Sequence, residues 1–270
     1  MHSLRIARNI VLCLSAFLLL SCATTTAPGA IGVDRGQLLL VSSQELDQMA
    51  AQSYNALLAS AKDEGVLNRD RAMLARVRAV AARLQPQTRV FRSDAPNWNW
   101  EVNVIQSDDL NAFCMPGGKI MFFSGLIQQL DLSDAEIAVI MGHEIAHALR
   151  EHSREHMSQA IAAQAAIGVG VAVLGLGQPS ADLAATGYQA LIATQFSRSD
   201  ETEADRMGLE LSARAGYDPR AGVALWQKMI NANQGGRPPE LLSSHPTDSN
   251  RIREMQSLLP TVMPLYTATQ

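Results

Sequence analysis

A five-residue motif, HEIAH at residues 143–147, constrains this chain more than any other feature of its sequence. A capping-box sequence, SDAE, precedes it and predicts a helix that starts near Asp134. Residues four apart on a helix lie about 40° apart around its axis, so His143 and His147 face one way and can bind one Zn²⁺ ion. Glu144 lies about 100° from His143, where its carboxylate reaches a metal-bound water without ligating the metal. The motif therefore predicts one catalytic zinc ion per chain.

Two further histidines follow on the same predicted helix, and the same geometry separates them from the first pair. His152 and His156 lie nine and thirteen residues after His143, about 180° and 220° around a straight helix. The longer motif H-E-x-x-H-x-x-G-x-x-H is excluded, because Arg150 and Ser153 occupy the positions of its glycine and its last histidine. We therefore expect His152 and His156 to be polar residues on a packed or solvated face. A separate pair of histidines, with its own function, is the alternative.

A catalytic zinc site with two histidines needs a third protein ligand, and one acidic segment can supply it. The segment SRSDETEAD, residues 197–205, places Glu201 and Asp205 four apart on one helix face and directs Glu203 elsewhere. One carboxylate can bind zinc, and the other can accept the second N–H of a ligating histidine and so fix its tautomer. An acidic helix start, favoured by the helix dipole, is the alternative for this segment taken alone.

The first residues predict export from the cytoplasm. Two arginines precede an apolar run that is too short for a spanning helix, so residues 1–21 are typical of a signal segment. The sequence LLSC that ends it resembles a bacterial lipobox, which implies a lipid on Cys22 as the new N-terminus. Ala23 in the next position implies sorting to the outer membrane, so we expect a periplasmic, lipid-anchored protein. A plain signal peptide and an uncleaved anchor are the alternatives.

The remaining sequence predicts one domain. The chain has 270 residues, 47% of them hydrophobic, which is enough for one domain with a substantial core. We expect a flexible tether over residues 22–41, a catalytic domain over residues 42–260 and a tail over residues 261–270, the tether because of its Thr-, Ala- and Gly-rich composition. The formal net charge of −4 and the aromatic content of 5% argue against nucleic acid as a partner.

Residue patterns within the domain predict a mainly α fold with a small antiparallel β-sheet, which is the α+β class. Helices are expected over about 42–64, 68–84, 134 onward, 183–196 and 201–215. Extended pieces are expected over 100–105, 111–113 and 119–123. The apolar segment 160–177 is close to the length of a membrane span. We expect it to be a buried or interface helix rich in small residues, and a membrane span is the alternative.

The histidine motif and the acidic motif together resemble those of a known family. HEIAH followed by FSRSDETEAD is similar to the HtpX- and Ste-type gluzincin zinc metallopeptidases. Over roughly residues 42–258 the chain is most similar to their exported lipoprotein branch, the BepA, LoiP and YcaL type. The resemblance implies a zincin-like domain that hydrolyses peptide bonds of misfolded or misassembled envelope proteins. An envelope assembly factor or chaperone with a mostly closed, self-inhibited zinc site is the alternative.

The resemblance also implies roles for individual residues. Glu201 would be the third zinc ligand, Asp205 would support a ligating histidine, and Glu144 would be the general base. His245, in the sequence SHP, would either donate to the transition-state oxyanion or reach the zinc and block it. An extended segment before the catalytic helix would pair with the substrate backbone as an added strand. Its residues are Asn111, Ala112 and Phe113.

Overall fold

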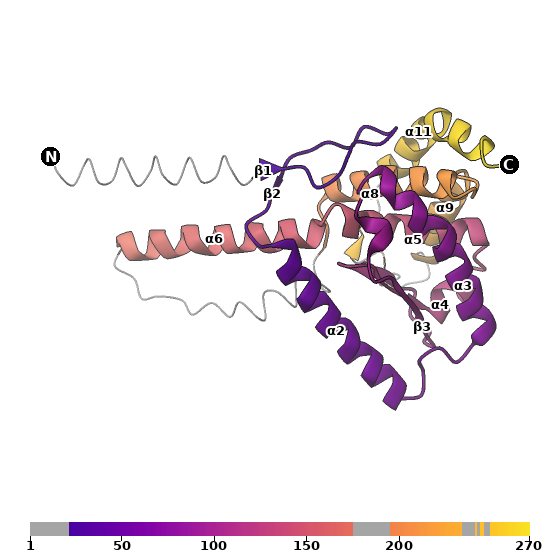
Figure 1. Cartoon of the computed structure of the whole chain (residues 1–270), viewed down its shortest axis with the longest axis horizontal. Coiled ribbons are helices and arrows are strands. Elements are labelled where there is room, and N and C mark those ends of the chain that lie inside the picture. The colour runs from indigo at the N-terminus through magenta and orange to yellow at the C-terminus, as the bar shows by residue number, and fades with distance from the viewer. Residues whose placement is uncertain (1–21, 175–194, 234–240, 242–243, 246–248) are drawn as a thin grey trace.

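The computed structural model describes residues 22–174, 195–233, 241, 244–245 and 249–270, and these residues form a mainly helical domain (Figure 1). The predicted signal segment and residues 183–194 of the helix predicted over 183–196 lie outside the described residues. The helices are α2 (Ser43–Asp63), α3 (Arg71–Leu84), α4 (Ser124–Gln129), α5 (Asp134–Leu149), α6 (His152–Leu174), α8 (Arg198–Arg214), α9 (Ala221–Asn233) and α11 (Ser249–Thr267). The strands are β1 (Cys22–Ala23), β2 (Gln37–Leu38), β3 (Glu101–Ile105), β4 (Ala112–Met115) and β5 (Lys119–Phe123).

The helices begin where their capping residues direct them to begin. Ser42 and Ser133 form the two predicted capping boxes, at the starts of α2 and α5. Ser197 forms a third one at the start of α8. Helix α3 is capped by Asp70 and does not extend back to Asn68, because Asn68 has a φ of 54°, outside the helical region. Local sequence therefore fixes where these four helices begin.

The sheet is mixed, so the prediction of an antiparallel sheet is wrong for one of its two pairings. The strand order is β3-β5-β4. Strands β4 and β5 form an antiparallel hairpin through Gly117 and Gly118, whose φ values of 74° and 80° suit the turn. Strand β3 pairs with the other side of β5 and runs parallel to it. Alternation in a sequence predicts that a segment is a strand, but it carries no information about which strand becomes its neighbour.

Helices α5 and α8 pack closely at the centre of the domain because both have a glycine at their contact. A Cβ atom built on Gly208 would lie 2.7 Å from the backbone nitrogen of His143, and one built on Gly142 would lie 2.9 Å from the carbonyl oxygen of Gly208. Real Cβ atoms do not come closer than 3.0 Å. The two helices that carry the predicted metal ligands are therefore in direct backbone contact.

The sequence predicts that the helix that carries HEIAH continues to His156, but the structure has a break before His152. Helix α5 ends at Leu149, Glu151 adopts a φ of 53°, and α6 starts anew at His152. The guanidinium group of Arg150 is fully buried. It donates to Glu203 of α8 and to the carbonyl oxygen of Arg35. These tertiary contacts hold the chain in a turn where its local propensity favours a helix.

Residues 22–41, which the sequence predicts to be a flexible tether, instead lie against the domain; we call them the N-terminal strap. The side chains of Ile31 and Val33 are 6% and 3% exposed and belong to the main hydrophobic core. The backbone N–H groups of Ala30 and Ile31 donate to the carboxylate of Glu210 in α8, at 2.8 and 3.2 Å. Strands β1 and β2 pair with each other within the strap. Two apolar residues and one buried carboxylate thus hold a segment of low hydrophobicity in place.

Helix α6 extends away from the rest of the domain (Figure 1). Its first turns contact the strap, since the hydroxyl group of Ser158 accepts a hydrogen bond from the backbone N–H of Leu40. No helix among the described residues is both long enough and apolar enough to cross a membrane.

Candidate metal centre

The structure brings four predicted residues to one buried point between α5 and α8. His143, His147, Glu201 and His245 each offer a ligand atom, and these atoms lie within 4.8 Å of one another. The Nε2 atoms of His143 and His147 are 3.1 Å apart. Glu201 Oε1 lies 3.5 Å from the Nε2 atom of His147. The structure thus places the two histidines of HEIAH and a carboxylate of the acidic segment side by side.

The four residues fit a zinc ion. Two ligand atoms that each lie about 2.1 Å from a tetrahedral zinc are about 3.4 Å from each other. The observed separations are close to this value, including 3.2 Å between His143 Nε2 and His245 Nδ1. Burial lowers the pKa of His147 well below its usual value, so this imidazole is neutral, as a metal ligand must be.

The electrostatics of the two glutamates differ, although both are buried. Burial raises the pKa of Glu144, and this effect exceeds the attraction of His245 and His143. Burial also acts to raise the pKa of Glu201, but the attraction of His245 and hydrogen bonds from His147 and His245 outweigh it and hold the pKa well below its usual value. Glu201 therefore stays ionised, while Glu144 has the raised proton affinity of a general base. The Oε1 atom of Glu144 is buried and accepts no hydrogen bond among the described residues.

Asp205 lies behind His143. Its Oδ1 atom is 3.0 Å from His143 Nδ1, so the other ring nitrogen faces the metal position. Arg251 of α11 holds this carboxylate with two contacts, of 2.6 and 2.7 Å, and its guanidinium group lies 3.8 Å from the centre of the Trp226 ring. Burial alone would raise the pKa of Asp205, but Arg251 lowers it, so the carboxylate remains ionised. The sequence did not assign a role to Arg251; its position shortly after SHP is the only signal for one.

His245 closes the site in this structure. Its Nδ1 atom lies 2.8 Å from Glu201 Oε1, and its Nε2 atom lies 3.4 Å from Glu144 Oε1. Phe196, a residue that the sequence did not single out, stacks on His147 with ring centres 3.9 Å apart. Its backbone N–H donates to the carbonyl oxygen of Ser244. Of the two roles that the sequence left open for His245, this geometry fits the one in which it reaches the metal position.

The predicted substrate strand lies at an edge of the sheet. Ala112 and Phe113 belong to β4, whose only strand neighbour among the described residues is β5. Asn111 lies just before β4, and its carbonyl oxygen accepts from the N–H of Phe123. The carbonyl oxygen of Leu110 accepts from the N–H of Leu241, four residues before His245. The segment that carries His245 is therefore tied to the chain beside this edge.

The prediction that His152 faces away from the first histidine pair is wrong, because the helix breaks before it. The Nδ1 atom of His152 lies 2.8 Å from the Nδ1 atom of His147. His156 does lie apart from the first pair, with its Nε2 atom 2.9 Å from Asp200 Oδ2. Glu203, which the sequence also directed elsewhere, meets His152 at 3.1 Å. The only signal in the sequence is that both residues are close to predicted ligands along the chain.

A small apolar pocket opens beside His143 and Glu144. It lies between α5, α8 and α9, and His245 forms part of its wall. Its apolar lining consists of Val139, Ile140, Leu225, Trp226, Met229 and Leu241. Its volume of about 20 Å³ leaves room for about one water molecule in this structure.

Comparisons with known proteins identify relatives that are proteases. The metalloendopeptidase OMA1 of Bos taurus mitochondria is 31% identical over 84% of this chain and 45% of its own length. The mitochondrial metalloendopeptidase OMA1 of Schizosaccharomyces pombe is 37% identical over 60% of this chain and 47% of its own length. The beta-barrel assembly-enhancing protease of Escherichia coli is 31% identical over 60% of this chain and 35% of its own length. The chain thus spans less than half the length of each of these relatives.

The predicted resemblance to a metallopeptidase family is confirmed, but the predicted branch is not. The relatives include mitochondrial proteins as well as a bacterial one, so they do not single out an exported lipoprotein branch. Residues 74–259, which contain all the ligand atoms described above, match the model of peptidase family M48. The chain therefore belongs to peptidase family M48 and carries a zincin-like metalloprotease domain.

Proposed function

We propose that this protein is a zinc-dependent metalloendopeptidase with one zinc ion per chain, bound by His143, His147 and Glu201. The observation that carries the proposal is the convergence of these ligand atoms at one buried point, with the carboxylate of Glu144 directly beside it. A bound zinc ion would supply a Lewis acid for the scissile carbonyl and lower the pKa of a bound water. The ion pair of Asp205 with Arg251 would keep His143 in the tautomer that presents Nε2 to the metal.

The residues around the metal would share the remaining chemistry. Glu144 takes a proton from the attacking water and passes it to the leaving amine, for which its raised pKa is suited. The edge of β4, with Asn111, Ala112 and Phe113, pairs with the substrate backbone.

Replacing Glu144 by glutamine tests this assignment. The amide has nearly the same shape but cannot act as a base, so Glu144→Gln should keep one zinc per chain and lose peptide turnover, by about 100-fold or more. Glu136→Gln is a matched control on the same helix, because glutamine also completes a capping box. Zinc content measured by mass spectrometry and turnover of a fluorogenic peptide give the two readouts. Normal turnover by Glu144→Gln would refute the proposed base.

A self-inhibited state is the second candidate, and the position of His245 favours it. His245 is 3% exposed and contacts both Glu201 and Glu144, where it obstructs the approach of a substrate. If His245 acts as a cap, His245→Ala should raise the turnover of short peptides. If His245 acts as an oxyanion donor, the same variant should lower turnover while zinc affinity stays within a few-fold of the wild type. The direction of the change therefore separates the two roles.

We further propose that the protein works in the bacterial envelope, anchored by a lipid on Cys22, on misfolded or misassembled envelope proteins. The support is the signal segment with its LLSC sequence and the printed name of the Escherichia coli relative, a beta-barrel assembly-enhancing protease. Cys22→Ala should abolish labelling by radioactive palmitate and move the protein from the membrane to the soluble fraction. Membrane attachment that survives Cys22→Ala without labelling would point to an uncleaved anchor instead.

A further inference from the structure

A second buried cluster lies behind His147, on the side away from the metal position. His152 is fully buried, with its Nδ1 atom 2.8 Å from His147 Nδ1 and its Nε2 atom 3.1 Å from Glu203 Oε2. The three groups therefore form a continuous line from a metal ligand to a carboxylate. His143 has a shorter connection, since it contacts the carboxylate of Asp205 directly.

Metal binding at His147 would fix every proton along this line. A neutral imidazole that ligates a metal through Nε2 carries its proton on Nδ1. His147 then donates to the Nδ1 atom of His152, which must accept and so carries its own proton on Nε2. That proton is donated to Glu203, which as a carboxylate only accepts. One arrangement of protons thus satisfies all the ring nitrogens, and it orients His147 for metal binding.

Two arginines hold the carboxylate at the end of this line. Arg150 Nε lies 2.9 Å from Glu203 Oε2, and Arg35 Nε lies 3.0 Å from Glu203 Oε1. The two guanidinium groups therefore fix the carboxylate of Glu203 as an acceptor for His152.

The positive charge of the same arginines argues against a second metal ion in this cluster. His152, Asp200 and Glu203 have the spacing of a metal site. However, Arg35 already pairs with both carboxylates and with Glu155, at 2.7 to 3.0 Å. A divalent cation would have to displace a guanidinium group from buried carboxylates. The residues of this cluster therefore support His147 and do not form a second metal site.

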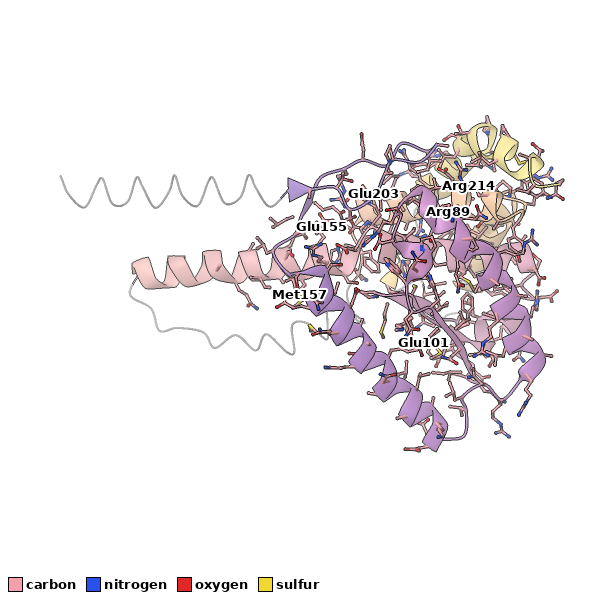
Figure 2. All side chains as sticks on the ribbon, in the orientation of Figure 1. Arg89, Glu101, Glu155, Met157, Glu203 and Arg214 are labelled. Atoms are coloured by element: carbon pink, nitrogen blue, oxygen red, sulfur yellow. The ribbon has the colours of Figure 1, made fainter. Side chains whose placement is uncertain are left out.

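Arg35 belongs to the N-terminal strap, so a segment remote from the metal centre takes part in this support. Figure 2 labels its partners Glu155 in α6 and Glu203 in α8, which lie near the strap. Gln37 adds a second tie, because its side-chain amide donates to the carbonyl oxygen of Arg150 and to Glu155. The strap therefore bridges α6 and α8 next to His152.

We propose that the seated N-terminal strap completes the metal centre: Arg35 and Arg150 fix Glu203, Glu203 fixes His152, and His152 orients the ligand His147. These are positioning residues, since none of them lies at the metal position. The inference rests on the proposed zinc site, and it assigns to the strap an influence on metal affinity. Displacing the strap from the domain should weaken zinc binding without any change in the ligands themselves.

Zinc affinity of the full chain, measured by competition with a chromophoric chelator, tests the first part. His152→Leu removes the acceptor and should weaken zinc binding by about 10- to 100-fold. His152→Asn retains an oxygen near the position of Nδ1, and it should recover part of this loss. His156→Gln is the matched control, because His156 pairs with Asp200 in the same cluster but does not contact His147. Equal affinities of the leucine and asparagine variants and the wild type would overturn the proposal.

Variants of Arg35 test the second part of the proposal, the influence of the strap on zinc affinity. Arg35→Ala should weaken zinc binding, and its effect should shrink when His152→Leu is already present, because both act through one line of contacts. Arg76→Ala is the control, since Arg76 has a similar exposure, 36% against 34%, and pairs with Asp134 away from the cluster. Additive effects of Arg35→Ala and His152→Leu would refute the coupling. Two zinc ions per wild-type chain would refute the assignment of the cluster, and no zinc at all would refute the proposed function itself.

Discussion

Replacing Gly208 by alanine should disturb the metal centre without touching a ligand. The added Cβ atom would lie 2.7 Å from the backbone nitrogen of His143, about 0.7 Å short of ordinary contact at 3.4 Å. The neighbouring atoms are backbone atoms of α5, including the carbonyl carbon of Gly142 at 3.0 Å, so no side chain can rotate away. The helices must separate by several tenths of an ångström. Overpacking of this kind costs about 1–3 kcal/mol of stability.

The same separation moves Glu201, on α8, away from the histidines on α5. We therefore expect Gly208→Ala to lower both the free energy of unfolding and the affinity for zinc, whereas loss of packing alone would lower only the first. Urea denaturation and chelator competition measure the two quantities. Gly36→Ala is the control, because a Cβ atom there meets nothing within 4 Å. Wild-type stability and zinc affinity in Gly208→Ala would refute the close helix contact.

Three further predictions concern the stability of the fold: the effect of bound zinc, of the ion pair between Arg150 and Glu203, and of low pH. Zinc at about 100 times its Kd should stabilise the metal-free protein by about 2.7 kcal/mol, seen as a higher midpoint of thermal unfolding that a chelator reverses. Arg150→Met should lower the free energy of unfolding by about 3–5 kcal/mol in urea, because it leaves the buried carboxylate of Glu203 with one partner fewer. The pKa of Glu203 is lowered from 4.5 to about 2 in the folded protein. Its contribution to stability is therefore complete above pH 4.5 and lost as the pH falls toward 2. Glu203→Gln should flatten this part of the stability profile, and an unchanged profile would contradict the assignment.

Local rules were sufficient to predict the part of the site that lies on single helices. The proposed ligands His143 and His147 face one way because of helix geometry alone, and the capping box at Ser133 fixes where α5 begins. Helix α8, which the sequence predicts from residue 201, begins at Arg198 instead. The facing of the two histidines and the start of α5 depend on residues within one or two helical turns, so the sequence contains the information directly. The contact of Asp205 with His143 joins two helices, and only the resemblance to a family indicated that Asp205 would support a histidine.

Features that depend on distant residues were not predicted correctly. The turn at Arg150 and Glu151 exists because Glu203, the strap and Arg92 bind these side chains. Nothing in the residues around the turn signals it, since they favour a continued helix. The composition of the strap predicts a tether, because its few apolar residues find their partners only in the folded domain. The parallel pairing of β3 with β5 was missed for the same reason, since register and neighbour are set by the whole sheet.

The two proposed histidine ligands are supported from opposite ends of the chain, and the supports differ in strength. His143 donates to a carboxylate, Asp205, that Arg251 of α11 holds in place. The acceptor beside His147 is a ring nitrogen of His152, and the nearest carboxylate is one step further away. A hydrogen bond to a charged acceptor is roughly twice as strong as one to a neutral acceptor. Loss of the carboxylate in Asp205→Ala should therefore weaken zinc binding more than His152→Leu does, and the reverse order would show that the support of His147 by the strap is the dominant one.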